Sequence, residues 1–166
     1  SQLGGCLQTF TRRGTRFDTG MHYIGSMEKG QVLHDFFRYF GLTEKLKLRK
    51  LDAEAYDVIR YMDREYNFAM GFERFTETML GYFPGEKEAI DKYTNKLREI
   101  GRSVSMLNSG ESGTSQTAYF DYFSTGIDNY LDSITSDKVL KNVLLGLSPI
   151  YAGVKEKSPL YIPMVI

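Results

Sequence analysis

The segment TRFDTGMHYIG, Thr15–Gly25, combines a short strand-like run with two glycines and one of only two histidines in the chain. Just before it, Leu7–Thr11 is a second short run rich in Thr, Leu and Phe, and Arg13-Gly14 separates the two. This pattern predicts two strands joined by a tight turn. The glycines at 20 and 25 allow backbone conformations that other residues disfavour, or close approach of another group to the main chain. The segment around these two glycines has more hydrogen-bonding side chains than a plain hairpin needs.

The rest of the chain is dominated by apolar residues at helical spacing. The predicted helices are Gln31–Phe40, Phe72–Tyr82, Glu86–Val104, Thr117–Phe123, Gly126–Ile134 and Lys138–Leu147. Gly41 is expected to end the first of them, and Ser136 and Asp137 to cap the last. The Ser/Gly-rich run Asn108–Gln116 is predicted to be a loop or linker.

Two further segments are predicted to be extended. Leu42–Leu51 alternates Leu with Lys or Arg, which is typical of a half-exposed strand with a solvated basic face. Ala55–Met62 and Tyr66–Met70 predict a hairpin turning at Asp63–Glu65, with apolar residues on both faces and therefore both faces covered. The tail Pro163–Ile166 is apolar and strand-like. The fold class is α+β, with a small N-terminal β-hairpin or sheet region followed by a mostly helical segment.

Composition limits the classes of function. The 166 residues contain 21 Lys+Arg and 21 Asp+Glu, so no global field favours nucleic acid. No apolar run approaches the roughly 20 residues that span a bilayer, and no signal peptide is visible. The single cysteine, Cys6, excludes an internal disulfide and agrees with a reducing compartment. These features predict a cytoplasmic protein that is open to peripheral membrane contact, and both ends suggest a piece cut from a longer chain.

Familiar catalytic motifs are missing from the sequence. It has no G-x-G-x-x-G for a dinucleotide and no G-x-S-x-G for a hydrolase. The two histidines, His22 and His34, have a spacing that fits no compact zinc pattern, so no metal is expected. His22 has the better case for a role as proton donor or polar anchor, because it lies in the glycine-framed segment.

Two blocks carry a family resemblance. The first is GGCLQTF, Gly4–Phe10, followed by GTRFDTGMHYIG, Gly14–Gly25, and the second is MGFERFTETMLGYFPGEKEAIDKY, Met70–Tyr93. Together they resemble the FAD-dependent phytoene desaturase, carotenoid isomerase and retinol saturase family. The likeness is good over Gly4–Tyr93 and faint from Leu97 onward. Where the family often has an arginine after the glycine pair, this chain has Cys6, which the retinol saturase branch tolerates.

The resemblance implies a fragment of a flavoprotein that lacks the N-terminal Rossmann glycine motif. Residues 1–25 would form the edge of the FAD-binding domain, and residues 26–166 part of a mostly helical substrate-binding domain. In the parent protein, the residues implied to approach FAD are Gly4, Gly5, Asp18 and Gly20.

The implied chemistry is reduction or desaturation of C=C bonds in an apolar polyene resembling a carotenoid or retinoid, with NAD(P)H as a candidate electron donor. His22 would be the catalytic proton donor. The residues expected to contact substrate are Met21, Tyr23, Phe36, Tyr56 and Phe72. These and neighbouring rings such as Phe37, Tyr61, Phe68 and Phe75 suit an apolar tunnel and equally suit a core.

A second function class stays open on the sequence alone. The same aromatic residues suit a non-enzymatic helical module that binds a lipid or a protein partner without flavin. The implied partners are therefore an apolar small molecule and the remainder of the parent chain, with no nucleic acid and no assigned oligomeric state. The isolated fragment is expected to be inactive.

Overall fold

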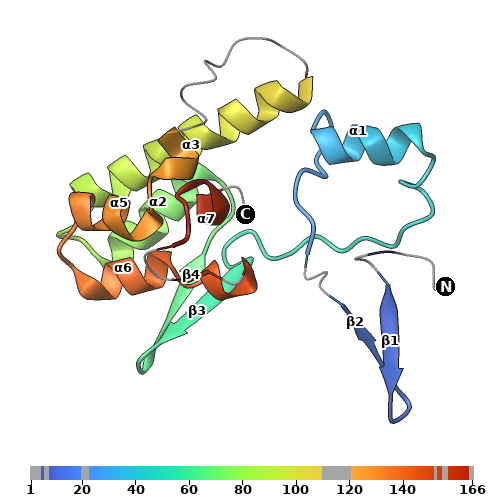
Figure 1. Ribbon diagram of the computed structural model, residues 1–166, viewed down its shortest axis with the longest axis horizontal. Coiled ribbons are helices and arrows are strands. Elements are labelled where there is room, and N and C mark those ends of the chain that lie inside the picture. Colours follow the sequence, from blue (N-terminus) through green and yellow to red (C-terminus); the bar gives the residue numbers. More distant parts are fainter. Residues whose placement is uncertain are drawn as a thin grey trace. The chain divides into compact units, whose positions relative to one another are not determined.

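The computed structural model describes residues 5, 8–19, 23–109, 121–151, 153–154 and 157–164. The chain divides into two compact units, Ser1–Lys47 and Leu48–Ile166, which are described separately. The predicted α+β class is confirmed, since two antiparallel hairpins are accompanied by helices that make up most of the second unit (Figure 1). The predicted domain boundary after residue 25 concerns the parent protein and stays a prediction.

The first unit begins with the predicted hairpin. Strands β1 (Thr9–Arg12) and β2 (Thr15–Asp18) pair antiparallel, with Thr9 opposite Asp18. Arg13 and Gly14 form the turn, at φ 51° and 78°. Two central residues with positive φ are what a two-residue turn needs to match the twist of its strands. The predicted tight connection is confirmed.

Helix α1 (Val32–Tyr39) is the only helix described in the first unit; it is one residue shorter at each end than the predicted Gln31–Phe40, and Gly41 follows its cap as predicted. Gly41 takes a φ of 64°, the Gly41 amide donates to the Arg38 carbonyl, and the Leu42 amide donates to the Phe37 carbonyl. This pair of bonds is a Schellman motif, which satisfies carbonyls at the helix end and favours glycine at its left-handed position.

The strand predicted over residues 42–51 is wrong. Residues 42–46 form a turn in which the amides of Lys45 and Leu46 both donate to the Leu42 carbonyl, and residues 47–51 are irregular. Alternating Leu and Lys match the period of a strand, but a strand also needs a partner for its backbone groups. No described strand pairs with this segment.

The second unit opens with the other predicted hairpin. Strands β3 (Asp57–Tyr61) and β4 (Arg64–Phe68) pair antiparallel, with Tyr61 opposite Arg64. The turn is therefore Met62-Asp63, earlier than predicted, and Met62 takes a positive φ of 56°. The expectation that both faces are covered, one of them by a ligand or another domain, stays a prediction, because this chain covers one face only. Ile59 packs against the core, whereas Val58 on the opposite face is 43% exposed.

The helices of the second unit follow the predicted order. They are α2 (Phe72–Tyr82), α3 (Lys87–Ser109), α5 (Ile127–Ile134) and α6 (Lys138–Leu144), followed by the 3-10 helix η2 (Ser148–Tyr151) and α7 (Tyr161–Met164). Helix α6 ends three residues earlier than predicted, and α7 includes residues 163–164 of the tail that was expected to be strand-like. Helix α3 extends five residues past its predicted end at Val104 and includes residues 108–109 of the predicted linker, so the linker prediction is wrong there. Residues 110–116 of that linker and 117–120 of the next predicted helix lie outside the described residues, and residues 121–124 are helical, one residue past the predicted end.

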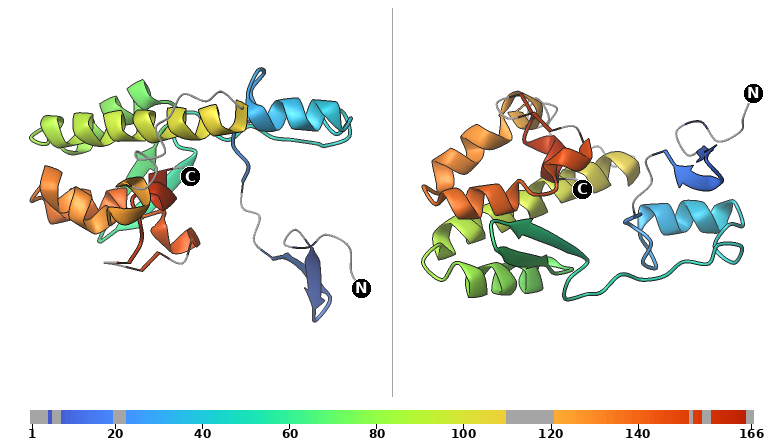
Figure 2. Two further views of the ribbon diagram at one scale, coloured as in Figure 1. Left: turned by 45° about the horizontal axis from the view of Figure 1, so that its top comes forward. Right: turned by 90° about the horizontal axis from the view of Figure 1, so that it is seen from below.

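Helix α3 lies at the centre of the second unit. It packs against α2, α5 and α7, while β4 packs on α2 and β3 on α6 (Figures 1 and 2). The largest fully buried side chains are Met79, Ile90, Ile100, Leu131, Leu140, Val143 and Thr94. Aromatic rings extend this core: Tyr66 stacks on Phe83 at 5.6 Å between centroids, and Phe68 meets Phe75 edge-on at 5.5 Å. Among the described residues, no helix is both long and apolar enough to cross a membrane.

Two buried threonines of this core are hydrogen-bonded, as burial requires. The Thr94 hydroxyl lies 3.0 Å from the Thr76 hydroxyl, and the Thr135 hydroxyl donates to Glu86 at 2.7 Å. Burial raises the pKa of Tyr130 to about 12, with a further contribution from the charge of Glu99, and its hydroxyl donates to the Lys92 carbonyl. Partial burial alone would raise the pKa of Glu99, but hydrogen bonds from Lys96 and Tyr122 hold it below its usual value.

The cap of α6 supports a stability prediction. The Asp137 side chain accepts hydrogen bonds from the amides of Val139 and Leu140, at 2.7 and 3.0 Å. Asp137→Ala leaves both amides without this acceptor and is expected to lower the free energy of unfolding by about 1 kcal/mol. Urea denaturation of the purified chain measures the change. Asp137→Ser keeps a capping oxygen and should lose much less, so equal losses in the two variants would contradict the capping role.

Candidate functional site

The predicted site residues near the N-terminus are only partly described. Gly4, Gly20, Met21 and His22 lie outside the described residues. Gly5, Asp18 and Tyr23 are described, and all three belong to the first unit. Gly5 has a φ of 51°, and no other described residue lies within 4 Å of where a Cβ would be. Asp18 is exposed at the end of β2, and Tyr23 is half-buried in the segment before α1.

Exposed aromatic side chains are the main feature of the first unit. Phe10 and Phe17 stack across the β1–β2 hairpin with centroids 5.2 Å apart, yet both are exposed. Helix α1 has apolar residues on one side but contains no buried residue, and Phe36 is 54% exposed. The Tyr39 and Phe40 rings meet edge-on at 5.1 Å and are exposed as well. An amphipathic helix normally buries its apolar stripe, so this surface suits a partner or an apolar ligand.

The two predicted substrate contacts in the second unit have different surroundings. Tyr56 is half-buried against the core, and its backbone amide donates to the Phe68 carbonyl at 2.9 Å. Phe72 is 39% exposed at the start of α2, with the Arg98 guanidinium 5.0 Å from its ring centroid. Arg98 also pairs with Glu73 at 2.6 Å, which holds the cation beside the ring. The structure therefore groups Phe72 with surface charges.

Two of the rings that the sequence left open between tunnel and core belong to the core. Phe68 and Phe75 are buried, and Phe75 lies 6.0 Å from the buried Tyr93 ring. Burial raises the pKa of Tyr93 well above its ordinary value, with smaller contributions from Tyr56 and Tyr130. These rings fill the space between β4, α2 and α3, so the tunnel expectation does not apply to Phe68 and Phe75.

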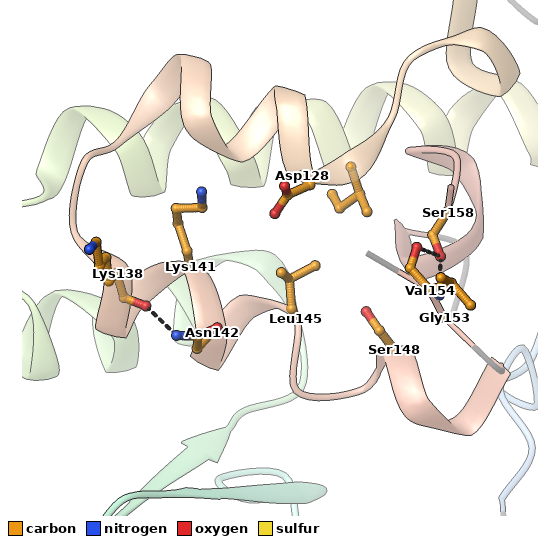
Figure 3. A pocket seen from close by; sticks show the side chains of 10 residues that line it. Asp128, Lys138, Lys141, Asn142, Leu145, Ser148, Gly153, Val154 and Ser158 are labelled. Carbon is orange, nitrogen blue, oxygen red and sulfur yellow. Dashed lines mark hydrogen bonds between the residues drawn. The ribbon is translucent and has the colours of Figure 1, made fainter. Parts of the chain in front are cut away.

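The second unit contains a pocket that the sequence did not predict (Figure 3). It has a volume of about 490 Å³, within the range of sites for small molecules. Its walls come from α5, α6, the start of η2 and the segment that precedes α7. An isolated bridge between Gly126 and Pro159 and a hydrogen bond from the Ile127 amide to the Ser158 carbonyl hold that segment against the start of α5.

The pocket combines apolar walls with a few polar groups. Ile127, Leu145 and Val154 supply apolar surface. Asp128, in the first turn of α5, is only 8% exposed and directs its carboxylate into the space between α5 and α6 (Figure 3). Lys141 also lines the pocket, but its ammonium pairs with Asp132 on the same helix as Asp128.

One buried polar group in this pocket, the Ser148 hydroxyl, has no hydrogen-bond partner among the described residues. No hydrogen bond or ion pair joins the Asp128 carboxylate to another described residue. By contrast, the Ser158 hydroxyl bonds both the amide and the carbonyl of Val154. No group of three or more His, Cys, Asp or Glu side chains in the described ranges is arranged to hold a metal ion.

Comparison with known proteins finds several curated relatives with one name. The chain is 24% identical over 174 aligned positions to all-trans-retinol 13,14-reductase of Danio rerio, covering 95% of this chain and 28% of that protein. It is 28% identical to the Rattus norvegicus protein of the same name and 29% identical to the human one, over 63% and 60% of this chain. The resemblance predicted from the two sequence blocks is confirmed.

These relatives also define what the similarity covers. The chain spans 28% of the Danio rerio reductase, 18% of the rat protein and 17% of the human protein, so it corresponds to a minor part of each. No family model and no solved structure matches the chain.

Proposed function

We propose that the chain forms part of the substrate domain of a flavin-dependent oxidoreductase that reduces or desaturates C=C bonds of a retinoid- or carotenoid-like substrate. The observation that carries this proposal is the similarity over 95% of the chain to a protein named all-trans-retinol 13,14-reductase. The exposed aromatic surface of the first unit adds support, because an enzyme acting on an apolar polyene needs apolar walls that exclude water.

The proposal includes FAD as the cofactor of the parent protein. Gly5 fits this role, because its positive φ and the open space on its Cβ side leave room for a group to approach the main chain closely. Gly4, Asp18 and Gly20 would complete the contacts. When bound, FAD supplies hydride transfer to or from the substrate carbon.

The residues of this chain would position the substrate and handle one proton. We assign His22 as the group that holds a proton near the reacting carbons, since a histidine titrates near neutral pH. Met21, Tyr23, Phe36, Tyr56 and Phe72 would contact the substrate. NAD(P)H is the proposed electron donor, and the remainder of the parent chain is a proposed partner.

A cytoplasmic location with peripheral membrane contact completes the proposal. Helix α1 exposes Phe36, Tyr39 and Phe40, and the residues that follow in the same unit include the exposed cations Lys45 and Lys47. Aromatic residues combined with cations favour the surface of an anionic bilayer. Such contact would give the enzyme access to an apolar substrate dissolved in the membrane.

The decisive experiment is flavin content. The segment is co-expressed with its native flanking sequence, purified, and examined by absorbance spectroscopy and by incubation with all-trans-retinol and a reductant. A flavin band and a product reduced at one C=C bond are expected, while the isolated 166-residue chain stays colourless. Gly5→Val should remove the flavin, whereas the matched Gly85→Val, at an open position in the second unit, should keep it. A colourless full-length protein would contradict the proposal and leave a binding module as the better reading.

A further inference from the structure

The pocket between α5 and α6 has the features of a binding site, and these do not depend on flavin or on the first unit. Its lining residues all belong to the second unit, Leu48–Ile166. Residues such as Asp128, Ser148 and Val154 lie far from the two sequence blocks that carry the family resemblance. The pocket therefore needs its own explanation.

Asp128 is the central observation. The Asp128 side chain is 8% exposed, and a buried carboxylate is ordinarily faced by a cation or by hydrogen-bond donors. Two lysines, Lys138 and Lys141, also line the pocket; Lys141 is paired with Asp132, and no described residue donates to Asp128. Asp128 lies in the first turn of α5, where the helix dipole favours a carboxylate.

Ser148 provides an independent second observation. Its hydroxyl is buried, has no partner in the described part of the chain, and is drawn pointing toward the interior of the pocket beside Leu145 (Figure 3). Unpaired buried polar groups are rare in folded proteins, so this hydroxyl, in a cavity that the Asp128 side chain also faces, suggests that the cavity is occupied by something polar.

The apolar walls of the pocket indicate the chemical nature of the rest of the bound molecule. Ile127, Leu145 and Val154 present hydrocarbon to the cavity, whose volume is about 490 Å³. Sites of this size with mostly apolar walls and a few polar groups bind small organic molecules, the polar groups fixing the orientation. A carboxylate can only accept hydrogen bonds, so the polar end of such a molecule must donate.

We propose that this pocket binds a small amphiphile whose polar end is a hydrogen-bond donor, an alcohol or a primary amine, held by Asp128 with its hydrocarbon part against Ile127, Leu145 and Val154. A ligand with an anionic head is disfavoured by repulsion from the same carboxylate, although Lys138 also lines the pocket. The Ser148 hydroxyl supplies a second polar contact, because it can accept from the ligand or donate to it.

The test compares three ligands of equal chain length on the 166-residue protein. 1-Octanol, octylammonium and octanoate are titrated separately, with amide chemical shifts followed by NMR and affinities taken from the shift curves. At least one donor-headed ligand should bind at least tenfold more tightly than octanoate, with the largest shifts at Asp128, Ser148 and Val154. Whichever of the two donor-headed ligands binds more tightly identifies the head group that the site prefers. The proposal would be overturned if octanoate bound as tightly as both donor-headed ligands. It would also be overturned if the chemical shift changes were confined to other residues.

Variants separate the role of the carboxylate from a structural effect. Asp128→Asn should weaken the donor-headed ligand at least fivefold and strengthen octanoate, because repulsion is removed while shape is kept. Loss of structure would weaken all three ligands alike, so the reversal of preference is the diagnostic readout. Asp121→Asn, an exposed carboxylate on the preceding helical turn, is the matched control and should leave all three affinities unchanged. An unchanged preference in Asp128→Asn would contradict the assignment.

Discussion

Met79→Ala is expected to lower the free energy of unfolding of the second unit by about 2–5 kcal/mol, because it removes a large buried side chain and leaves a cavity. Met79 lies on α2 with 0% of its surface exposed, within the core cluster that includes Phe75 and Ile90. Urea denaturation followed by far-UV circular dichroism measures the loss. A change near the upper limit would leave little of the stability of a typical domain.

Met62 supplies a matched control for this prediction. It is 74% exposed in the turn between β3 and β4, so the same substitution removes the same atoms without opening a cavity. Met62→Ala should change the free energy of unfolding by less than about 0.5 kcal/mol. If both variants lost the same stability, the assignment of Met79 to the core would be wrong.

Gly146→Ala is expected to destabilise the second unit by about 1–3 kcal/mol through overpacking. A Cβ at position 146 would lie 2.6 Å from Cγ2 of Ile59 and 2.7 Å from its Cδ1 and Cγ1. Ile59 is half-buried on β3 and packs against the core, so its side chain has little room to move away. The glycine thus permits the close contact between the end of α6 and the hairpin.

A double-mutant cycle tests this explanation. Ile59→Ala removes the atoms that the new methyl group would meet, so Gly146→Ala should cost much less in that background, and the two effects should not add. Gly101 is the contrasting glycine, because it lies within α3 and nothing lies within 4 Å of its Cβ position. Gly101→Ala should stabilise the helix by up to about 1 kcal/mol. A gain at both glycines would rule out the overpacking argument.

Local sequence patterns predicted most elements of the fold. Helix α2 begins and ends at the predicted residues, Phe72 and Tyr82, and the cap at Asp137 and the stop at Gly41 were both predicted. These features depend on neighbouring residues in the chain: helical spacing, a capping carboxylate and a glycine in a left-handed conformation. Such signals act over one or two turns, and the sequence contains all of them.

Elements that depend on distant partners were predicted less well. The alternation over 42–51 indicated a strand, but no described strand pairs with it. The turn of the second hairpin fell at Met62-Asp63 because the register of β3 on β4 placed it there, with a non-glycine residue at positive φ. Residue types alone favoured Asp63–Glu65, and pairing across the sheet overrode them.

The candidate sites divide in the same way. The sequence by itself determined the resemblance, through Gly4–Gly25 and Met70–Tyr93, and it named His22 and the glycines as site residues whose roles stay predictions. Only the tertiary structure brought Asp128 and Ser148 to one pocket, because α5, α6 and the segment before α7 meet through packing and through the Gly126–Pro159 bridge. No spacing in the sequence marks these residues as neighbours. A carboxylate becomes informative only once burial has removed it from water and left it without a partner, and burial is a property of the packed chain.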